Sequence, residues 1–146
     1  MSTRCAIGIK KNDSLNGIKW IYCHWDGYIV DGVGSTLYKN YKDEKTVDEL
    51  ISLGDLSTLG KLPIADAKAW TELDNDDYEG CRAYFNRPGL EEPKEIHRCD
   101  YEKFKDLSYD YKYLFDNGKW IVIKDRKEKD LDKIFNPQLE ALRRRR

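Results

Sequence analysis

Residues 18–41 read Ile-Lys-Trp-Ile-Tyr-Cys-His-Trp-Asp-Gly-Tyr-Ile-Val-Asp-Gly-Val-Gly-Ser-Thr-Leu-Tyr-Lys-Asn-Tyr, and the rest of the chain is organised around them. The first part of this stretch, residues 18–25, is an apolar run typical of a β-strand. The glycines that follow permit a sharp change of direction. Val33, Leu37 and Tyr41 then recur at the spacing of one helical face. We therefore expect a strand, a turn and a helix in succession.

A partner for this strand lies just before it in the chain. The side chains of residues 3–9 alternate between two faces, as they do in a strand, and a short polar loop joins the two segments. An antiparallel hairpin follows, in which we expect Cys5 opposite Cys23 and Arg4 opposite His24. Large apolar side chains stand on both faces of this hairpin, so we expect it at the centre of a sheet.

Shorter elements follow along the chain. Thr46 and Glu49 form a capping box, which predicts the start of a second helix, and Asp100 predicts the start of a short third helix. Asn117-Gly118 is the turn signal of a hairpin, with Tyr109 and Tyr113 expected on one face of its first strand. The other predicted elements are strands over residues 80–86 and 94–98 and a helical charged segment from residue 125.

Together these elements predict an α+β protein, with a mostly antiparallel sheet of four to six strands and two or three packed helices. No repeat or linker divides the chain, so residues 1–142 are expected to form a single domain with a basic tail at residues 143–146. The 146 residues are 40% hydrophobic and 36% charged, and the apolar share argues against disorder.

The composition also limits the classes of partner. The formal net charge of −1 gives no basic field for nucleic acid. No apolar run approaches the ~18 residues that span a membrane, and the N-terminus lacks the apolar core of a signal peptide. We therefore expect a cytosolic protein. Its four cysteines are expected to be buried free thiols, and no metal or cofactor is predicted.

Polar and aromatic groups concentrate where the first long strand ends. On strand alternation His24 and Asp26 share a face, where they either form an acid–base pair or hydrogen-bond to fix the turn. Trp25 is one of two aromatic candidates for stacking on a base, and Arg4 suits phosphate or an ion pair with Asp26. Backbone N–H groups at the predicted helix start suit an anion. The predicted ligand-binding residues are Arg4, His24, Trp25, Asp26, Tyr28, Gly32 and Gly34.

No catalytic set is complete, so enzyme activity is uncertain and a non-enzymatic role is preferred. Cys23 and His24 are neighbours in a strand and therefore point to opposite faces, which prevents a nucleophile–base pair. The alternative is a small hydrolase. It would use Ser2 as an N-terminal nucleophile after removal of Met1, or the pair of His24 and Asp26.

Several motifs resemble a family of small phage-encoded proteins of unassigned function. They are Ser2-Thr3-Arg4 with Ile7 and Ile9, Tyr22-Cys23-His24-Trp25-Asp26-Gly27-Tyr28, Val33-Gly34, the segment 50–60, Tyr113-Leu114-Phe115 and Gly118-Lys119-Trp120. The family usually has proline after the tyrosine, where this chain has Ile29. The resemblance implies a phage origin and expression in the cytoplasm of a bacterial host, and it implies no reaction. Small phage proteins often act against host defences, which is an association rather than a physical argument.

These observations lead to one hypothesis and its alternatives. The first is a non-enzymatic counter-defence protein that binds and sequesters a nucleotide-derived immune signal. In it, Arg4 and the amides of residues 32–34 hold phosphate, Trp25 and Tyr28 stack on the base, and His24 and Asp26 set orientation. The alternative is an inhibitor that blocks a host defence protein by direct binding through its exposed aromatic residues. An architectural phage protein, which would form a homo-oligomer, stays open.

Overall fold

The structure is a computed structural model that describes residues 3–11, 16–73 and 77–136. The predicted nucleophile Ser2 and the basic tail at residues 143–146 lie outside the described residues. Among the described residues, no helix combines the length and the apolar character needed to cross a membrane.

One sheet of eight strands organises the described residues, and its strand order is β4-β3-β2-β1-β6-β7-β8, with β5 also paired to β2. The strands are β1 Cys5–Lys10, β2 Ile18–Cys23, β3 Leu56–Thr58, β4 Arg82–Ala83, β5 His97–Cys99, β6 Tyr111–Asp116, β7 Lys119–Lys124 and β8 Lys127–Asp130. The α-helices are α1 Val33–Asn40, α2 Glu44–Ile51, α3 Tyr101–Asp106 and α4 Leu131–Phe135, with 3-10 helices η1 Ala67–Trp70 and η2 Tyr84–Asn86.

The α+β class is confirmed, but the sheet is larger than predicted and mixed. Cys5 pairs with Cys23 as expected, so the register of the first hairpin is confirmed. β1 also pairs in parallel with β6, and β2 pairs in parallel with β3. The strands predicted over residues 80–86 and 94–98 correspond to β4 and β5, which are shorter than expected. The two additional strands are β3, whose three residues are too few for alternation to show, and β8, which lies in a segment predicted to be helical.

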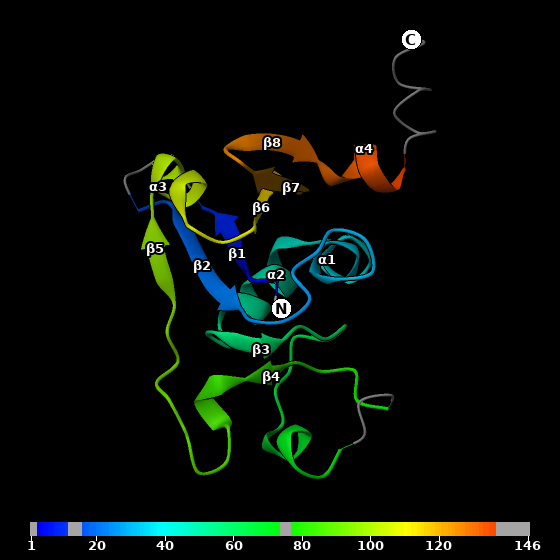
Figure 1. Ribbon diagram of the computed structural model, residues 1–146, viewed down its shortest axis with the longest axis vertical. Coiled ribbons are helices and arrows are strands. Elements are labelled where there is room, and N and C mark those ends of the chain that lie inside the picture. Colours follow the sequence, from blue (N-terminus) through cyan, green and yellow to red (C-terminus); the bar gives the residue numbers. More distant parts are fainter. Residues whose placement is uncertain (1–2, 12–15, 74–76, 137–146) are drawn as a thin grey trace.

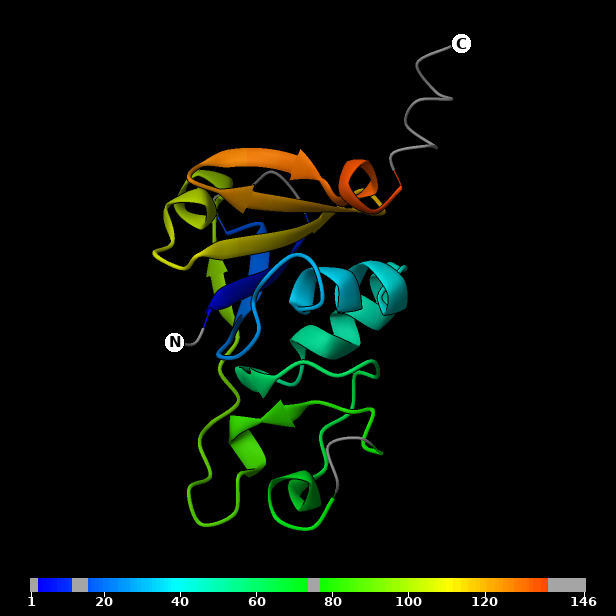
Figure 2. The same ribbon diagram turned by 45° about the vertical axis from the view of Figure 1, so that its right-hand side comes forward.

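The sheet separates two apolar cores. Figure 2 shows α1 and α2 on one side of β1 and β2, and α3 on the other. The first core lies under α1, α2 and α4, and it contains Ile7, Leu37 and Leu50. The second core lies under α3, whose Phe104 is fully buried. The rest of this second face carries no further α-helix among the described residues. Tyr22, His97 and Tyr109 are partly exposed there, whereas Trp20 and its indole N–H are buried.

The capping residues correct one predicted boundary. α2 begins at Glu44, because the carboxylate of Asp43 accepts the N–H of Thr46 at 2.8 Å. The predicted capping box with Thr46 as first cap was therefore wrong by three residues. The predicted cap of α3 is confirmed, since Asp100 Oδ1 accepts the N–H of Lys103 at 2.8 Å.

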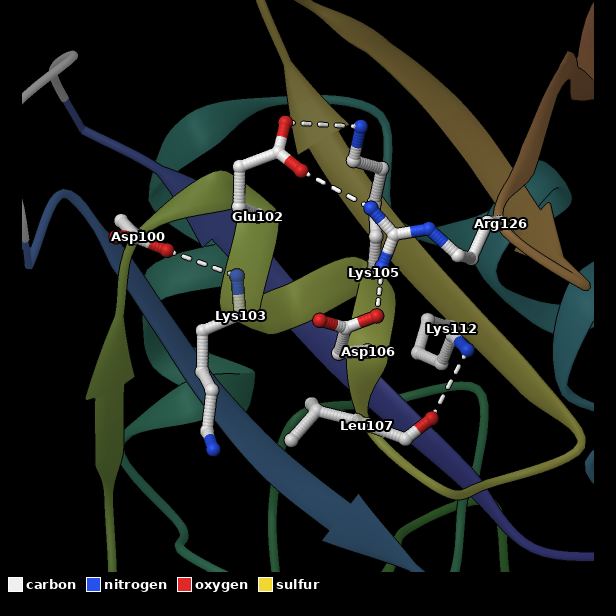
Figure 3. A network of polar contacts seen from close by, with 8 residues as sticks. All are labelled: Asp100, Glu102, Lys103, Lys105, Asp106, Leu107, Lys112 and Arg126. Carbon is white, nitrogen blue, oxygen red and sulfur yellow. Dashed lines mark hydrogen bonds and ion pairs between the residues drawn. The ribbon is translucent and has the colours of Figure 1, made fainter.

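The C-terminal hairpin turns at Asn117-Gly118 as predicted, with both residues at positive φ. Tyr113 packs in the first core, but Tyr109 lies before the strand and packs on the second face, so the two do not share a face. The segment from residue 125 was predicted to be helical, yet it forms β8 before α4. Arg126, in the turn before β8, pairs with Glu102 and Asp106 of α3 (Figure 3).

The four cysteines are free thiols and all are buried, as predicted. Burial raises the pKa of the Cys81 thiol to about 11. Burial also raises the pKa of the Cys5 thiol, and its hydrogen bond with Cys23 adds to the rise. The thiols of Cys5 and Cys81 are therefore protonated at neutral pH and serve as small packing groups rather than nucleophiles.

Candidate functional site

The loop at residues 24–32 joins β2 to α1 and is held firmly by the rest of the chain. The N–H of Gly27 donates to Thr3 O at 2.8 Å, and the hydroxyl of Tyr113 donates to Gly27 O at 2.7 Å. The N–H of Val33 donates to Asp26 O at 2.8 Å. Because these contacts reach the loop from three directions, its backbone conformation is set before any partner arrives.

The start of α1 is occupied by the loop itself. The N–H of Gly34 donates to Tyr28 O at 3.1 Å, and the N–H of Ser35 donates to Ile29 O at 2.8 Å. The N–H groups of residues 33–35 therefore bind the chain's own carbonyls rather than standing ready for an anion. A Cβ atom at Gly34 would lie 2.7 Å from Ile29 O. This glycine is required for close backbone packing.

The loop displays apolar side chains to solvent. Trp25 is 45% exposed, Tyr28 is 42% exposed and Val30 is 60% exposed. The hydroxyl of Tyr28 donates to Asp26 at 3.2 Å, which fixes the phenol ring. Asp26 and Asp31 are exposed, and both have a φ of 58°. The result is an apolar surface with two carboxylates at its border, which we name the loop surface (residues 25–31).

A small hollow lies beside the loop surface. Its volume is 120 Å³, and its lining includes Trp25, Asp26, Asp31 and Gly32. Pockets for small molecules usually measure about 300–1,000 Å³. The hollow is therefore too small for a nucleotide, and its two carboxylates would repel phosphate.

His24 and Asp26 do not form the pair that strand alternation predicts. β2 ends at Cys23, and the positive φ of Asp26 breaks the alternation. His24 Nδ1 instead lies 2.6 Å from the hydroxyl of Tyr22. The two predicted partners are thus each bound to a different tyrosine, and the acid–base arrangement is absent from the described residues.

His24 belongs to a second group of side chains, on the face of the sheet that carries α3. The ring of Trp20 stacks on His97 with centroids 4.3 Å apart, and the ring of Tyr22 lies 5.3 Å from that of Tyr109. Tyr109 also meets Trp20 edge-on at 6.1 Å. We name Trp20, Tyr22, His24, His97 and Tyr109 the aromatic cluster.

Arg4 adds a positive charge to the aromatic cluster. Burial raises the pKa of Tyr22 and of Tyr109, and the charge of Arg4 opposes both rises. Arg4 is exposed. It forms no ion pair with Asp26 in the part of the chain that the structure describes. The charge of Arg4 thus acts on Tyr22, the tyrosine that is hydrogen-bonded to His24. Trp25, Asp26 and Tyr28 lie on the loop surface, and Gly32 is buried at the hollow beside it.

Asp55 and His97 are site residues that sequence reasoning missed. The carboxylate of Asp55 accepts the N–H of Tyr22 at 2.9 Å, and His97 Nε2 lies 3.1 Å from the same oxygen. These residues meet only because two short strands share one edge of β2, a pairing for which the sequence carries no local signal. The turn residue Asp55 and the lone His97 are otherwise unremarkable in the sequence.

A larger hollow lies elsewhere, between β1, the start of α2 and the turn after β6. Its volume is 860 Å³, and its lining balances three lysines, Lys10, Lys11 and Lys42, against three carboxylates, Asp43, Glu44 and Asp116. Lys10 lies 3.8 Å from Asp116, and Lys11 lies 2.8 Å from Glu44 and 2.6 Å from Asp48. The hollow therefore offers little net charge to an anionic ligand.

The two surfaces together are equipped for binding. The loop surface offers rigid apolar contacts, and the aromatic cluster offers ring faces beside a guanidinium group. Comparisons of the chain with protein-family models, with curated proteins and with solved structures find no match.

Proposed function

We propose that this protein is a non-enzymatic, phage-encoded binding protein that antagonises bacterial defence by direct contact with a defence protein. The observation that carries the proposal is the loop surface, where Trp25, Tyr28 and Val30 are held exposed on a fixed backbone. Direct binding of a defence protein is the alternative to capture of a nucleotide-derived signal, and the geometry of the loop favours this alternative.

The loop surface has the properties of a protein-binding hot spot. Tryptophan and tyrosine dominate the binding energy of many interfaces. A loop that is already ordered loses little conformational entropy when it binds. Asp26 and Asp31 border the apolar side chains. The expected partner surface is therefore an apolar groove with basic residues at its rim.

The phage origin and the cytoplasmic setting rest on the resemblance of the N-terminal motifs to small phage-encoded proteins. Trp25, Tyr28 and Gly27 all belong to the motif that carries this resemblance. Antagonism of bacterial defence is associated with small phage proteins in general. Experiments in infected cells test this role.

Photo-crosslinking in infected bacteria tests the proposal. A benzoylphenylalanine is placed at position 28 or 30 of the loop surface. A matched control carries it at position 39, on the exposed side of α1. We expect a crosslink to one host protein from positions 28 and 30 and none from position 39, and we expect Trp25→Ala to abolish it.

The crosslinked protein is then purified and its affinity measured. Loss of a hot-spot tryptophan removes about 2 kcal/mol or more of binding free energy, about 30-fold in Kd. Phage protection that survives unchanged in Trp25→Ala would overturn the proposal, and so would crosslinks that are equal at all three positions.

Capture of a nucleotide-derived signal is a second candidate function, favoured by Arg4 beside Tyr22 and Tyr109. Base stacking on an aromatic ring is worth about 1–3 kcal/mol. A guanidinium group also binds phosphate through two hydrogen bonds. In this version the rings of the aromatic cluster hold the base, and Arg4 holds the phosphate.

Calorimetry with ADP-ribose and with cyclic di-AMP tests this second candidate. We expect binding that is weakened at least about tenfold in Arg4→Ala and in Tyr109→Ala, and that is unchanged in Tyr28→Ala. The opposite pattern, with binding lost only in Tyr28→Ala, would contradict a role for the aromatic cluster. If neither nucleotide gives a binding signal, capture of a nucleotide is contradicted and only the protein-binding function is left.

A further inference from the structure

One edge of β2 is shared by two different strands. Residues 18–20 of β2 pair with β5, and Cys23 pairs with β3. Figure 1 shows β5 beside the first part of β2 and β3 at its end. The N–H of Tyr22 faces the gap between them and donates to the side chain of Asp55 at 2.9 Å. The N–H of Tyr22, which in a continuous sheet would donate to a neighbouring strand, thus donates to a carboxylate instead.

Three donor groups of different chemistry converge at this gap. One ligand atom from each of Asp55, Glu95 and His97 lies within 4.8 Å of the other two. His97 Nε2 lies 3.1 Å and 3.3 Å from the two oxygens of Asp55. Two donors that bind one Zn²⁺ ion at about 2.0–2.2 Å lie about 3–3.5 Å apart. The separation of the imidazole and the carboxylate therefore matches a shared ion.

Side chains of the sheet hold two of the three donors in place. The ring of His97 stacks on Trp20, which limits its rotation. Asp55 is oriented by the N–H of Tyr22, as outer-shell hydrogen bonds orient metal ligands in many sites. Both donor side chains are partly buried, whereas Glu95 is exposed and completes the group from the solvent side.

Gly54 permits this approach. Its φ is +77°, and a Cβ atom there would lie 3.0 Å from the N of Glu95 and 3.1 Å from the Cα of Lys94. The segment that carries Glu95 and His97 therefore runs directly against the residue before Asp55. Any side chain at position 54 would push the third ligand away from the other two.

We propose that Asp55, Glu95 and His97 bind a divalent first-row transition metal ion such as Mn²⁺ or Zn²⁺. One imidazole nitrogen and two carboxylate oxygens suit both ions. Three protein ligands leave at least one coordination position open to water or to an anionic group. The proposal goes beyond the proposed function and does not depend on it, because the loop surface contributes none of the three ligands.

Calorimetry with MnCl₂ and with ZnCl₂ tests the site in the full-length protein. Loss of an outer-shell partner typically costs 10–100-fold in metal affinity. We therefore expect Glu95→Gln and His97→Ala to weaken binding of either ion by at least about 100-fold. Glu95 is exposed, so Glu95→Gln leaves the fold intact, and its circular dichroism spectrum confirms this.

Two control variants separate this site from other donors. Glu91→Gln changes an exposed carboxylate on the same segment, and His24→Ala removes the other histidine. We expect both to bind Mn²⁺ as the unchanged protein does. Mn²⁺ also avoids thiolates, which are soft ligands, so its binding does not report on the cysteines.

Paramagnetic broadening by Mn²⁺ locates the ion independently. We expect the NMR signals of the rings of His97 and Trp20 to disappear first, at Mn²⁺ concentrations that leave visible the ring of Phe135, which packs against the first core on the other face of the sheet. The proposal is overturned if neither ion binds, if Glu95→Gln binds as tightly as Glu91→Gln, or if the broadening centres on other carboxylates.

Discussion

Replacement of Tyr113 by phenylalanine probes the link between the sheet and the loop at residues 24–32. Tyr113 is fully buried in β6, and its hydroxyl donates to Gly27 O at 2.7 Å. Tyr113→Phe keeps the ring and its packing, so the change removes this hydrogen bond and little else. The carbonyl of Gly27 then lacks this buried donor.

The expected loss follows from the cost of an unsatisfied buried group. A carbonyl left without its partner costs about 1–3 kcal/mol. We therefore expect Tyr113→Phe to lower the free energy of unfolding at pH 8 by that amount. For a domain of this size each kcal/mol lowers Tm by about 2–4 °C.

The same variant has an opposite signature at high pH. Burial raises the pKa of Tyr113 far above its ordinary value of 10.0. Above pH 10 the unfolded chain releases this phenolic proton while the folded chain keeps it, so stability falls as the pH rises. The slope is about 1.4 kcal/mol per pH unit for each such group. Tyr113→Phe removes one of these groups. The difference in free energy of unfolding between the unchanged protein and the variant should therefore shrink by about 1.4 kcal/mol for each pH unit above 10.

Urea denaturation at pH 8 and at pH 11 measures both effects, with the midpoint and the slope fitted separately. Tyr111→Phe is the matched control, because Tyr111 precedes Tyr113 on the same face of β6 but is only partly buried. We expect it to change stability by less than about 0.5 kcal/mol. A stability difference for Tyr113→Phe that is the same at both pH values would refute the account of its buried hydroxyl.

Three further changes test the fold by urea denaturation. Asp100→Ala removes the cap of α3 and should cost about 1 kcal/mol, whereas Asp100→Asn should cost much less; equal losses would contradict capping. Gly118→Ala should lower the free energy of unfolding by about 1–2 kcal/mol. The loss comes from the φ of +80° alone, because an added Cβ would meet no neighbouring group within 4 Å. An unchanged midpoint would mean that the turn has a different conformation. Phe104→Ala should cost about 3–5 kcal/mol by emptying the second core, and a loss below 1 kcal/mol would mean that α3 is not packed there.

The elements that could be predicted from the sequence are those with local signals. The hairpin from Cys5 to Cys23, the start of α3 at Asp100 and the turn at Asn117-Gly118 each depend on residues close together in the chain. Short-range backbone hydrogen bonds and turn geometry decide such elements. The parallel pairing of β1 with β6 joins residues more than a hundred positions apart, and no periodicity encodes it.

The sequence indicates which residues lie at the end of β2, but it does not indicate which of their side chains contact each other. Residues 24–28 do form a polar and aromatic feature at the end of β2, but the positive φ of Asp26 sends His24 and Asp26 to different tyrosines. Gly34 was assigned to anion binding because a sequence does not show whether a backbone N–H is already bonded. Asp55 and His97 were missed since only the split edge of β2 brings them together.

The affinity of the crosslinked defence protein for two matched alanine variants shows whether the loop surface binds that protein. Val30 is 60% exposed on the loop surface, and Leu90 is 61% exposed in the loop between η2 and β5. Val30→Ala and Leu90→Ala remove similar apolar area, and Trp25→Ala sets the scale of a full hot-spot loss. If the loop surface is the binding site, Trp25→Ala and Val30→Ala both bind more weakly, by about 30-fold in Kd for Trp25→Ala, and Leu90→Ala binds with an unchanged Kd. An unchanged Kd in Trp25→Ala, or an equal loss in Leu90→Ala, would contradict binding at the loop surface.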